Sequence, residues 1–138
     1  MKLTTLRGNE KKSTKLTPYN IDWTGKKVSN PQQKTKDFLF PFFKHDHVLE
    51  EFVIPGSRLR IDLFNVSRKI IIEVSPKQHF EYSSFLHGSR INFKDQVKRD
   101  DQKRLWAEKN KLRFVELTEI DLKNLTSELF EIKFGITL

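Results

Sequence analysis

The sequence contains no cysteine among its 138 residues. Disulfide bonds, thiol catalysis and cysteine-ligated zinc are therefore excluded, and any bound metal ion would be held by aspartate, glutamate or histidine. The chain also lacks an apolar run long enough to cross a bilayer, and it lacks a charged stretch followed by a short apolar core. We therefore expect an intracellular protein that is not secreted and has no membrane partner.

Acidic residues are scarce in the first 36 positions, where two of them face nine lysines and arginines for a local net charge of +7. The remaining 102 residues carry 17 basic and 16 acidic groups. A cationic segment with few apolar residues is typical of an arm laid along a nucleic-acid backbone, whose phosphates release counterions when they are neutralised. A disordered, solubilising tail is the alternative. The lysines of this segment expected to contact nucleic acid are Lys11, Lys12, Lys15, Lys26 and Lys27.

The length is that of one domain, and turn-rich composition separates an extended basic arm at 1–30 from a single domain at 31–138. Tyr19 and Trp23 are expected to pin the arm to the domain. The domain pattern begins with a helix, for which Ser29 or Asn30 is the cap and Pro31 a suitable first residue. Pro41 is expected to end or kink this helix.

The next elements are read from periodicity and turn signals. Two short runs around a Pro-Gly turn predict a β-hairpin, and a third strand, a long helix and a fourth strand follow at 47–54, 57–64, 69–74, 91–110 and 111–117. A strand, a helix and another strand form the pattern of a parallel pair. The predicted fold is α/β, a mixed four-stranded sheet flanked by helices in the order αβββαβ.

Beyond the fourth strand, Leu122, Leu125 and Leu129 recur at helical spacing after Thr118, which suits a helix cap. This pattern predicts one C-terminal helix. The run 130–134 is expected to form a short edge strand.

Two carboxylates are expected to meet at one end of the sheet. Alternation along the second strand places Asp62 opposite the face of Ile61, and Glu73 lies at the end of the third strand. If the two strands pair antiparallel, both carboxylates come onto one face. They repel each other unless a cation lies between them, and their oxygens suit Mg²⁺ or Mn²⁺. Such an ion could activate water against a phosphodiester. Solvent-facing carboxylates on an amphipathic sheet are the alternative.

Two further residues add to this pattern. His79 follows Glu73 closely, and its ordinary pKa suits proton transfer near neutral pH, although a lone loop histidine is often structural. On the long helix, Asp100 and Arg104 fall in the inward stripe. Asp100 either forms an internal salt bridge with Arg104 or supports the site beside Lys103, in contact with a phosphate.

These residues resemble the PD-(D/E)xK nuclease superfamily, and within it the Vsr-like phage homing endonucleases with a Glu-Asp-x-His-Asp signature. The resemblance spans about 31–120 and rests on Asp62, on EVSPKQH at 73–79 and on KRDDQKRLWAEKN at 98–110. It implies a restriction-endonuclease-like core and metal-dependent cleavage of DNA. Asp62 and Glu73 would then be ligands of Mg²⁺ or Mn²⁺. We expect the Val74 carbonyl or the Ser75 backbone to contribute a further ligand. His79 would transfer a proton.

Three positions depart from the family pattern. Ser75 stands where the superfamily has its lysine, so that Lys77, which would stabilise developing charge, or His79 must substitute. Pro76 replaces the usual glycine. The leading glutamate corresponds to Gln32 or Gln33, and we assign Gln33 to the catalytic group.

These departures favour a second interpretation, a catalytically degenerate nucleic-acid-binding module on the same fold. A third is a small basic RNA-associated or structural protein without a site. On the nuclease interpretation, the partner is double-stranded DNA, a homodimer is expected to extend recognition, and the resemblance suggests a phage or mobile-element origin in a bacterial or phage-infected cell. The aromatic loop 79–90 would lie over DNA, or its aromatic residues would cap the core. The domain residues expected to contact DNA are Arg58, Arg60, His87, Arg90 and Lys103.

Overall fold

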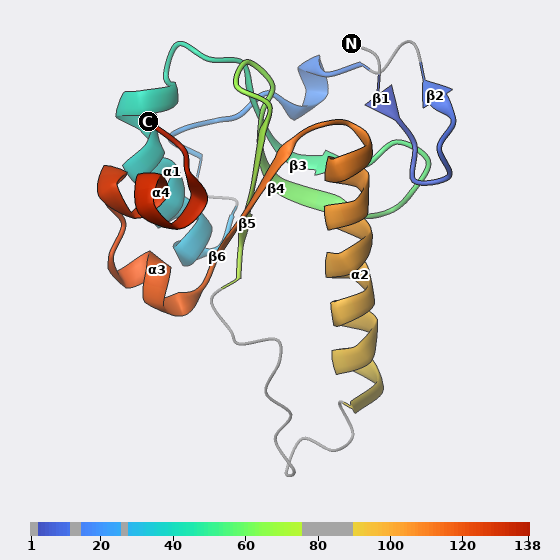
Figure 1. Ribbon diagram of the computed structural model, residues 1–138. Coiled ribbons are helices and arrows are strands. Elements are labelled where there is room, and N and C mark those ends of the chain that lie inside the picture. The colour runs from blue at the N-terminus through green and yellow to red at the C-terminus, as the bar shows by residue number, and fades with distance from the viewer. Residues whose placement is uncertain (1–2, 12–14, 26–27, 76–89) are drawn as a thin grey trace.

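The computed structural model of the chain describes residues 3–11, 15–25, 28–75 and 90–138 (Figure 1). Within these ranges, no helix combines the length and the apolar character that crossing a membrane requires. The described residues form a mixed α/β fold in which helices flank a four-stranded sheet on both sides. The expectation of a mixed four-stranded sheet flanked by helices is confirmed.

The sheet has the strand order β3-β4-β5-β6. Its first three strands, β3 (Val48–Val53), β4 (Arg60–Asn65) and β5 (Ile70–Val74), pair antiparallel. The long helix α2 (Arg90–Lys109) then returns the chain, and β6 (Arg113–Leu117) pairs parallel with β5. The predicted hairpin and the predicted parallel pair are therefore both present, which fixes the carboxyl ends of β5 and β6 at the same edge of the sheet.

The helix α1 (Asn30–Phe43) begins where the sequence predicts. The Ser29 hydroxyl caps it by accepting a hydrogen bond from the Gln32 amide at 3.4 Å. Pro41 does not end the helix, which continues to Phe43. In the last turn a proline removes only one intrahelical donor, and the Lys44 amide still donates to the Phe40 carbonyl at 2.9 Å.

The C-terminal region differs from its prediction. The expected single helix is two helices, α3 (Glu119–Lys123) and α4 (Ser127–Phe134), so the predicted edge strand at 130–134 is wrong. Thr118 caps α3 as predicted and forms a capping box with Asp121, whereas Thr126 starts a second helix with its own cap. The two caps outweigh the β propensity of the aromatic and β-branched residues in 130–134.

The N-terminal segment packs on the domain through the short strands β1 (Leu3–Thr4) and β2 (Glu10–Lys11) and the 3₁₀ turn η1 (Thr17–Tyr19). The Trp106 indole N–H donates to the Thr4 carbonyl at 2.6 Å, beside the C-terminal end of α2. The Tyr19 ring meets Phe52 at 5.1 Å between centroids, and the Trp23 ring meets Phe40 at 5.4 Å. The contacts predicted for Tyr19 and Trp23 are thus present.

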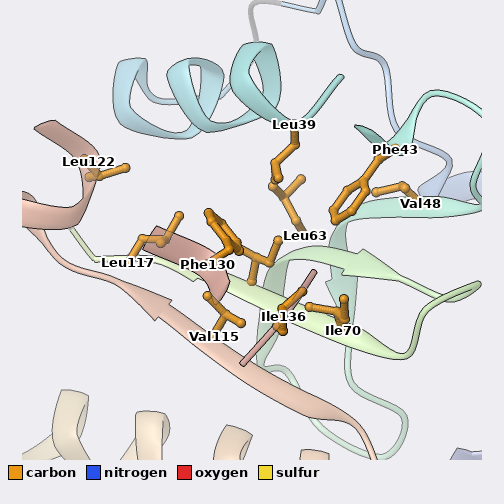
Figure 2. Close-up of a cluster of buried hydrophobic side chains, with 11 residues drawn as sticks. Leu39, Phe43, Val48, Leu63, Ile70, Val115, Leu117, Leu122, Phe130 and Ile136 are labelled. Carbon is orange, nitrogen blue, oxygen red and sulfur yellow. The ribbon is translucent and has the colours of Figure 1, made fainter. Parts of the chain in front are cut away.

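Each face of the sheet covers a hydrophobic cluster. Helices α1, α3 and α4 lie on one side and α2 on the other (Figure 1). The cluster on the α1 side includes Leu39 and Phe43, which point from α1 toward Leu63 of β4 (Figure 2). The cluster on the α2 side centres on Trp106, which is fully buried. Burial on both faces makes the sheet a rigid support for side chains at its edge.

One strand residue changes the faces to which its neighbours point. Glu51 in β3 has a backbone φ of 50°, in the left-handed region that residues other than glycine rarely adopt. Successive strand residues normally point to opposite faces, yet both Glu50 and Glu51 reach α1. Glu50 Oε2 lies 2.7 Å from Lys36 Nζ, and Glu51 Oε1 accepts a hydrogen bond from Gln32 Nε2 at 3.2 Å. The positive φ of Glu51 therefore brings two acidic side chains, those of Glu50 and Glu51, toward α1.

Candidate active site

Strands β4 and β5 stop pairing at the point where the predicted carboxylates lie. The register runs from Asn65–Ile70 to Leu63–Ile72, so Asp62 and Glu73 would form the next pair. Instead of that backbone pair, two bonds from backbone to side chain form. The Asp62 amide donates to Glu73 Oε2 at 3.0 Å, and the Val74 amide donates to Asp62 Oδ2 at 2.8 Å. Each carboxylate thus replaces a backbone carbonyl of the ladder. The juxtaposition predicted from strand alternation is present, and backbone donors fix its orientation.

Helix α2 supplies a cation to this pair. Lys103 Nζ lies 2.6 Å from Glu73 Oε1, and the Glu73 residue is only 5% exposed. This ion pair is a polar contact that the described residues make with the buried Oε1. Helix α2 thereby places a positive charge directly beside a buried carboxylate.

A second acid–base pair borders the same place. The parallel register sets Glu116 of β6 beside Glu73. Glu116 Oε2 lies 2.6 Å from Arg104 Nη2, and the Arg104 guanidinium stacks over the Phe114 ring at 4.5 Å from its centroid. Arg104 therefore pairs across to Glu116 of β6.

These groups line a polar cavity of about 190 Å³ between the end of the sheet and α2. Its charged lining within the described residues consists of four carboxylates and one ammonium. These groups belong to Asp62, Glu73, Asp100, Glu116 and Lys103. Glu116 is ion-paired with Arg104, and Glu73 is ion-paired with Lys103. The lining accordingly contains a surplus of carboxylates over cations.

This surplus changes how Asp62 holds its proton. Burial and the neighbouring Glu73 carboxylate raise the pKa of Asp62 to about 8, against the hydrogen bond from the Val74 amide and the charge of Lys103, which lower it. A proton shared between the two carboxyl groups relieves their repulsion when no other cation is near. A divalent cation would relieve it more completely.

The donor set fits magnesium better than a metal that needs a full protein cage. Within the described ranges, no group of three or more histidine, aspartate or glutamate side chains is arranged to hold a metal ion. Mg²⁺, however, is usually bound through one or two carboxylates, with water and substrate phosphates completing the octahedron. Asp62 and Glu73 supply those two carboxylates. Val74 lines the cavity, and its amide is committed to Asp62.

The structure does not bring Gln33 to the carboxylates. Its side-chain amide donates to the Trp23 carbonyl at 3.1 Å and to Asp37 Oδ1 at 2.9 Å. The neighbouring Gln32 is the residue that approaches, because its amide lies 3.5 Å from the Asp62 carbonyl. A helical step of about 100° separates the two side chains, and the sequence pattern alone left both positions open.

The remaining predicted residues are distributed as follows. Lys103, predicted to contact nucleic acid, lies inside the carboxylate cavity, whereas Lys15, Arg58 and Arg60 are exposed. Sequence reasoning did not assign Glu116 to the site or predict its pairing with Arg104, although a parallel pairing of β5 and β6 sets Glu116 beside Glu73. The calls that lie outside the described residues or side chains are Lys11, Lys12, Lys26, Lys27, Lys77, His79, His87 and Arg90.

Comparisons with models of protein families, with curated proteins and with solved structures gave no significant match to this chain. The function is therefore argued from the geometry of the carboxylate cavity and from the sequence pattern around it.

Proposed function

We propose that this protein is a metal-dependent DNA endonuclease of the PD-(D/E)xK type, with a restriction-endonuclease-like core. The observation that carries the proposal is the pair of carboxylates, Asp62 and Glu73, held by backbone amides where β4 and β5 separate. The pair faces a polar cavity with surplus negative charge. A binding surface for polyanions has no use for buried carboxylates of this kind, whereas a divalent cation needs them.

Asp62 and Glu73 would hold Mg²⁺ or Mn²⁺, and the Val74 carbonyl or the Ser75 backbone would contribute a further ligand. A divalent ion bound there supplies Lewis-acid polarisation of a phosphodiester and a more acidic water. The protein contributes orientation, since both carboxylates are fixed by amide donors before any ligand arrives.

Lys103 offers the ammonium that the family pattern places two residues after Glu73, where this chain has Ser75. Its Nζ lies beside Glu73 and lines the same cavity. From there it can contact a phosphate oxygen and stabilise charge that develops on it. We assign it this role in addition to the roles predicted for Lys77 and His79, which remain predictions, as do the homodimer and the phage or mobile-element origin.

The test is cleavage of a supercoiled plasmid with Mg²⁺ or Mn²⁺, read as nicked and linear product. Glu73→Gln and Asp62→Asn keep an acceptor oxygen for the backbone amides but remove the charge. We expect each to reduce the cleavage rate by at least about 100-fold, the size of effect seen when one preorganised electrostatic group is removed. Glu108→Gln, an exposed glutamate on α2, is the matched control and is expected to cleave at the wild-type rate.

A catalytically degenerate binding module is the second candidate. Ser75 favours it, because this buried residue, whose amide donates to the Leu117 carbonyl at 2.8 Å, cannot provide an ammonium. In that case wild type and both variants shift the plasmid in a gel equally and none of them cuts it. Such a result would remove the nuclease proposal for this substrate.

A further inference from the structure

A second hollow adjoins the carboxylate cavity and has the opposite charge. Its volume is about 370 Å³, and it lies between the start of β4 and helix α2. Asp62, Asp100 and Lys103 line both hollows, so they form the wall that the two share. Its lining also contains three arginines that do not line the carboxylate cavity, Arg58, Arg60 and Arg99.

These three arginines differ from Arg68 and Arg104, which form ion pairs. Arg68 is paired with Asp46 at 2.8 Å, and Arg104 is paired with Glu116 at 2.6 Å. Arg58, Arg60 and Arg99 are exposed, and none of them has an ion-pair partner in the part of the chain that the structure describes. In this hollow the basic residues outnumber the carboxylates of Asp62 and Asp100 on the shared wall, and the fork geometry of a guanidinium group matches a phosphate.

The arrangement favours a strand with repeated phosphates over a single phosphate group. A lone anion held by the arginines would leave the adjoining carboxylates without a function. In a nucleic-acid strand, neighbouring phosphates can occupy neighbouring hollows, one beside the arginines and the next beside the carboxylates and their cation. The shared Lys103 lies between the two positions and can contact either phosphate.

We propose that the arginine hollow, formed by Arg58, Arg60 and Arg99, binds the backbone phosphate adjacent to the one that is cleaved. The proposal rests on the proposed function for the position of the cleaved phosphate. It adds Arg99 to the interface and gives the two hollows separate tasks. The arginine hollow holds the strand in register, while the carboxylate cavity carries out hydrolysis.

The experiment measures binding of a fluorescently labelled DNA duplex by anisotropy in EDTA, where no cleavage occurs, across a series of salt concentrations. We expect each of Arg58→Ala, Arg60→Ala and Arg99→Ala to weaken binding about 3- to 10-fold and to lower the salt slope by about 1. Lys44→Ala, an exposed lysine at the end of α1, removes the same charge and is the control. The melting temperature of each variant checks that it is folded.

Two results would overturn the inference. One is an equal loss of affinity in Lys44→Ala and in the arginine variants, which would mean that net charge alone matters. The other is a mononucleotide that binds as tightly as the duplex, which would mean that no strand is recognised. A wild-type protein that binds through these arginines but never cuts with metal leaves the hollow in place and removes the nuclease. If the wild type cleaves DNA and the arginine variants bind it as tightly as the wild type does, the nuclease proposal stands and the arginine hollow is removed.

Discussion

On the α1 side of the sheet, the buried charges Lys36 and Asp121 each have a partner of their own, whereas on the α2 side two carboxylates share one ammonium. Lys36 is fully buried and contacts Glu50 and the Asp22 carbonyl. Asp121 accepts from Lys133 at 2.6 Å and from the Thr118 amide at 3.0 Å. These two buried charges are balanced by the protein itself.

The two sides consequently differ in proton affinity. Although burial acts to raise it, hydrogen bonds from Lys133 and Thr118 hold the pKa of Asp121 below its ordinary value. The pKa of Asp62 is raised, first by burial and then by Glu73. The difference teaches that burial alone does not mark a functional acid. Surplus charge that the protein leaves unbalanced is the more informative sign, because a ligand can complete it.

Removing the balancing cation on the α1 side should make that side resemble the other at a large cost in stability. Lys36→Met leaves Glu50 beside α1 without its ammonium. We expect the free energy of unfolding in urea to fall by about 3–5 kcal/mol, as for other broken buried pairs. Lys36→Met combined with Glu50→Leu should recover much of this loss. A single variant as stable as the wild type would contradict the comparison.

The raised pKa of Asp62 predicts a pH dependence of stability in metal-free buffer. Its ordinary value is 3.8 and its folded value is about 8, so the folded state binds the proton more tightly than the unfolded state. Stability is therefore fully present below about pH 4 and is lost as the pH rises toward 8. Half of this rise in the pKa of Asp62 corresponds to on the order of 2–3 kcal/mol in the free energy of unfolding.

Asp62→Asn should remove this pH dependence, because the amide does not titrate while its oxygen can still accept from the Val74 amide. Urea denaturation of both proteins between pH 4 and pH 8 measures the difference. Parallel stability curves for wild type and variant would contradict the assignment of the pH response to Asp62.

Adding the missing positive charge should bring the α2 side closer to balance. Mg²⁺ or the non-catalytic ion Ca²⁺ at about 100 times its dissociation constant adds about 2.7 kcal/mol of stability. A chain of this size should then melt about 5–10 °C higher. EDTA should reverse the rise, and Asp62→Asn should abolish it. An equal rise in the variant would place the ion elsewhere.

The smallest expected effect concerns Asp121. Asp121→Asn weakens the capping box of α3 and the pair with Lys133, and we expect a loss of about 1 kcal/mol. Because the pKa of Asp121 is lowered, its stabilisation is present above the ordinary pKa and is lost as the pH falls through the folded value. Wild type and variant should therefore converge in acid, as measured by thermal melting between pH 2 and pH 6. A gap that persists at the acid end would contradict this assignment.

The sequence predicted the parts of the fold that depend on residues close together in the chain. Strand alternation and a short connection placed Asp62 and Glu73 together, and helix capping by Ser29 and Thr118 was readable from residue type. The contact of Trp106 with Thr4 spans 102 positions and leaves no periodic signal in the sequence. The position of Lys103 depends on where α2 crosses the sheet, which helical spacing alone does not determine.

Backbone geometry accounts for the other differences. The positive φ of Glu51, which turns adjacent acids toward α1, has no marker in a sequence that offers no glycine there. The C-terminal helix is divided because Thr126 acts as a second N-cap. Helix propensity alone gives little weight to one threonine before an apolar run, so it does not mark this break. In each case a tertiary or capping contact outweighs local preference.

The replacement of ladder hydrogen bonds by the carboxylates of Asp62 and Glu73 has an evolutionary consequence. Both side chains satisfy the backbone of a neighbouring strand, so selection for folding acts on them as well as selection for chemistry. On the proposed function, a descendant without nuclease activity would still need an acceptor oxygen at each position. Amide side chains would meet that need. Selection for folding therefore preserves an acceptor oxygen at each position, whereas only selection for activity preserves the negative charge.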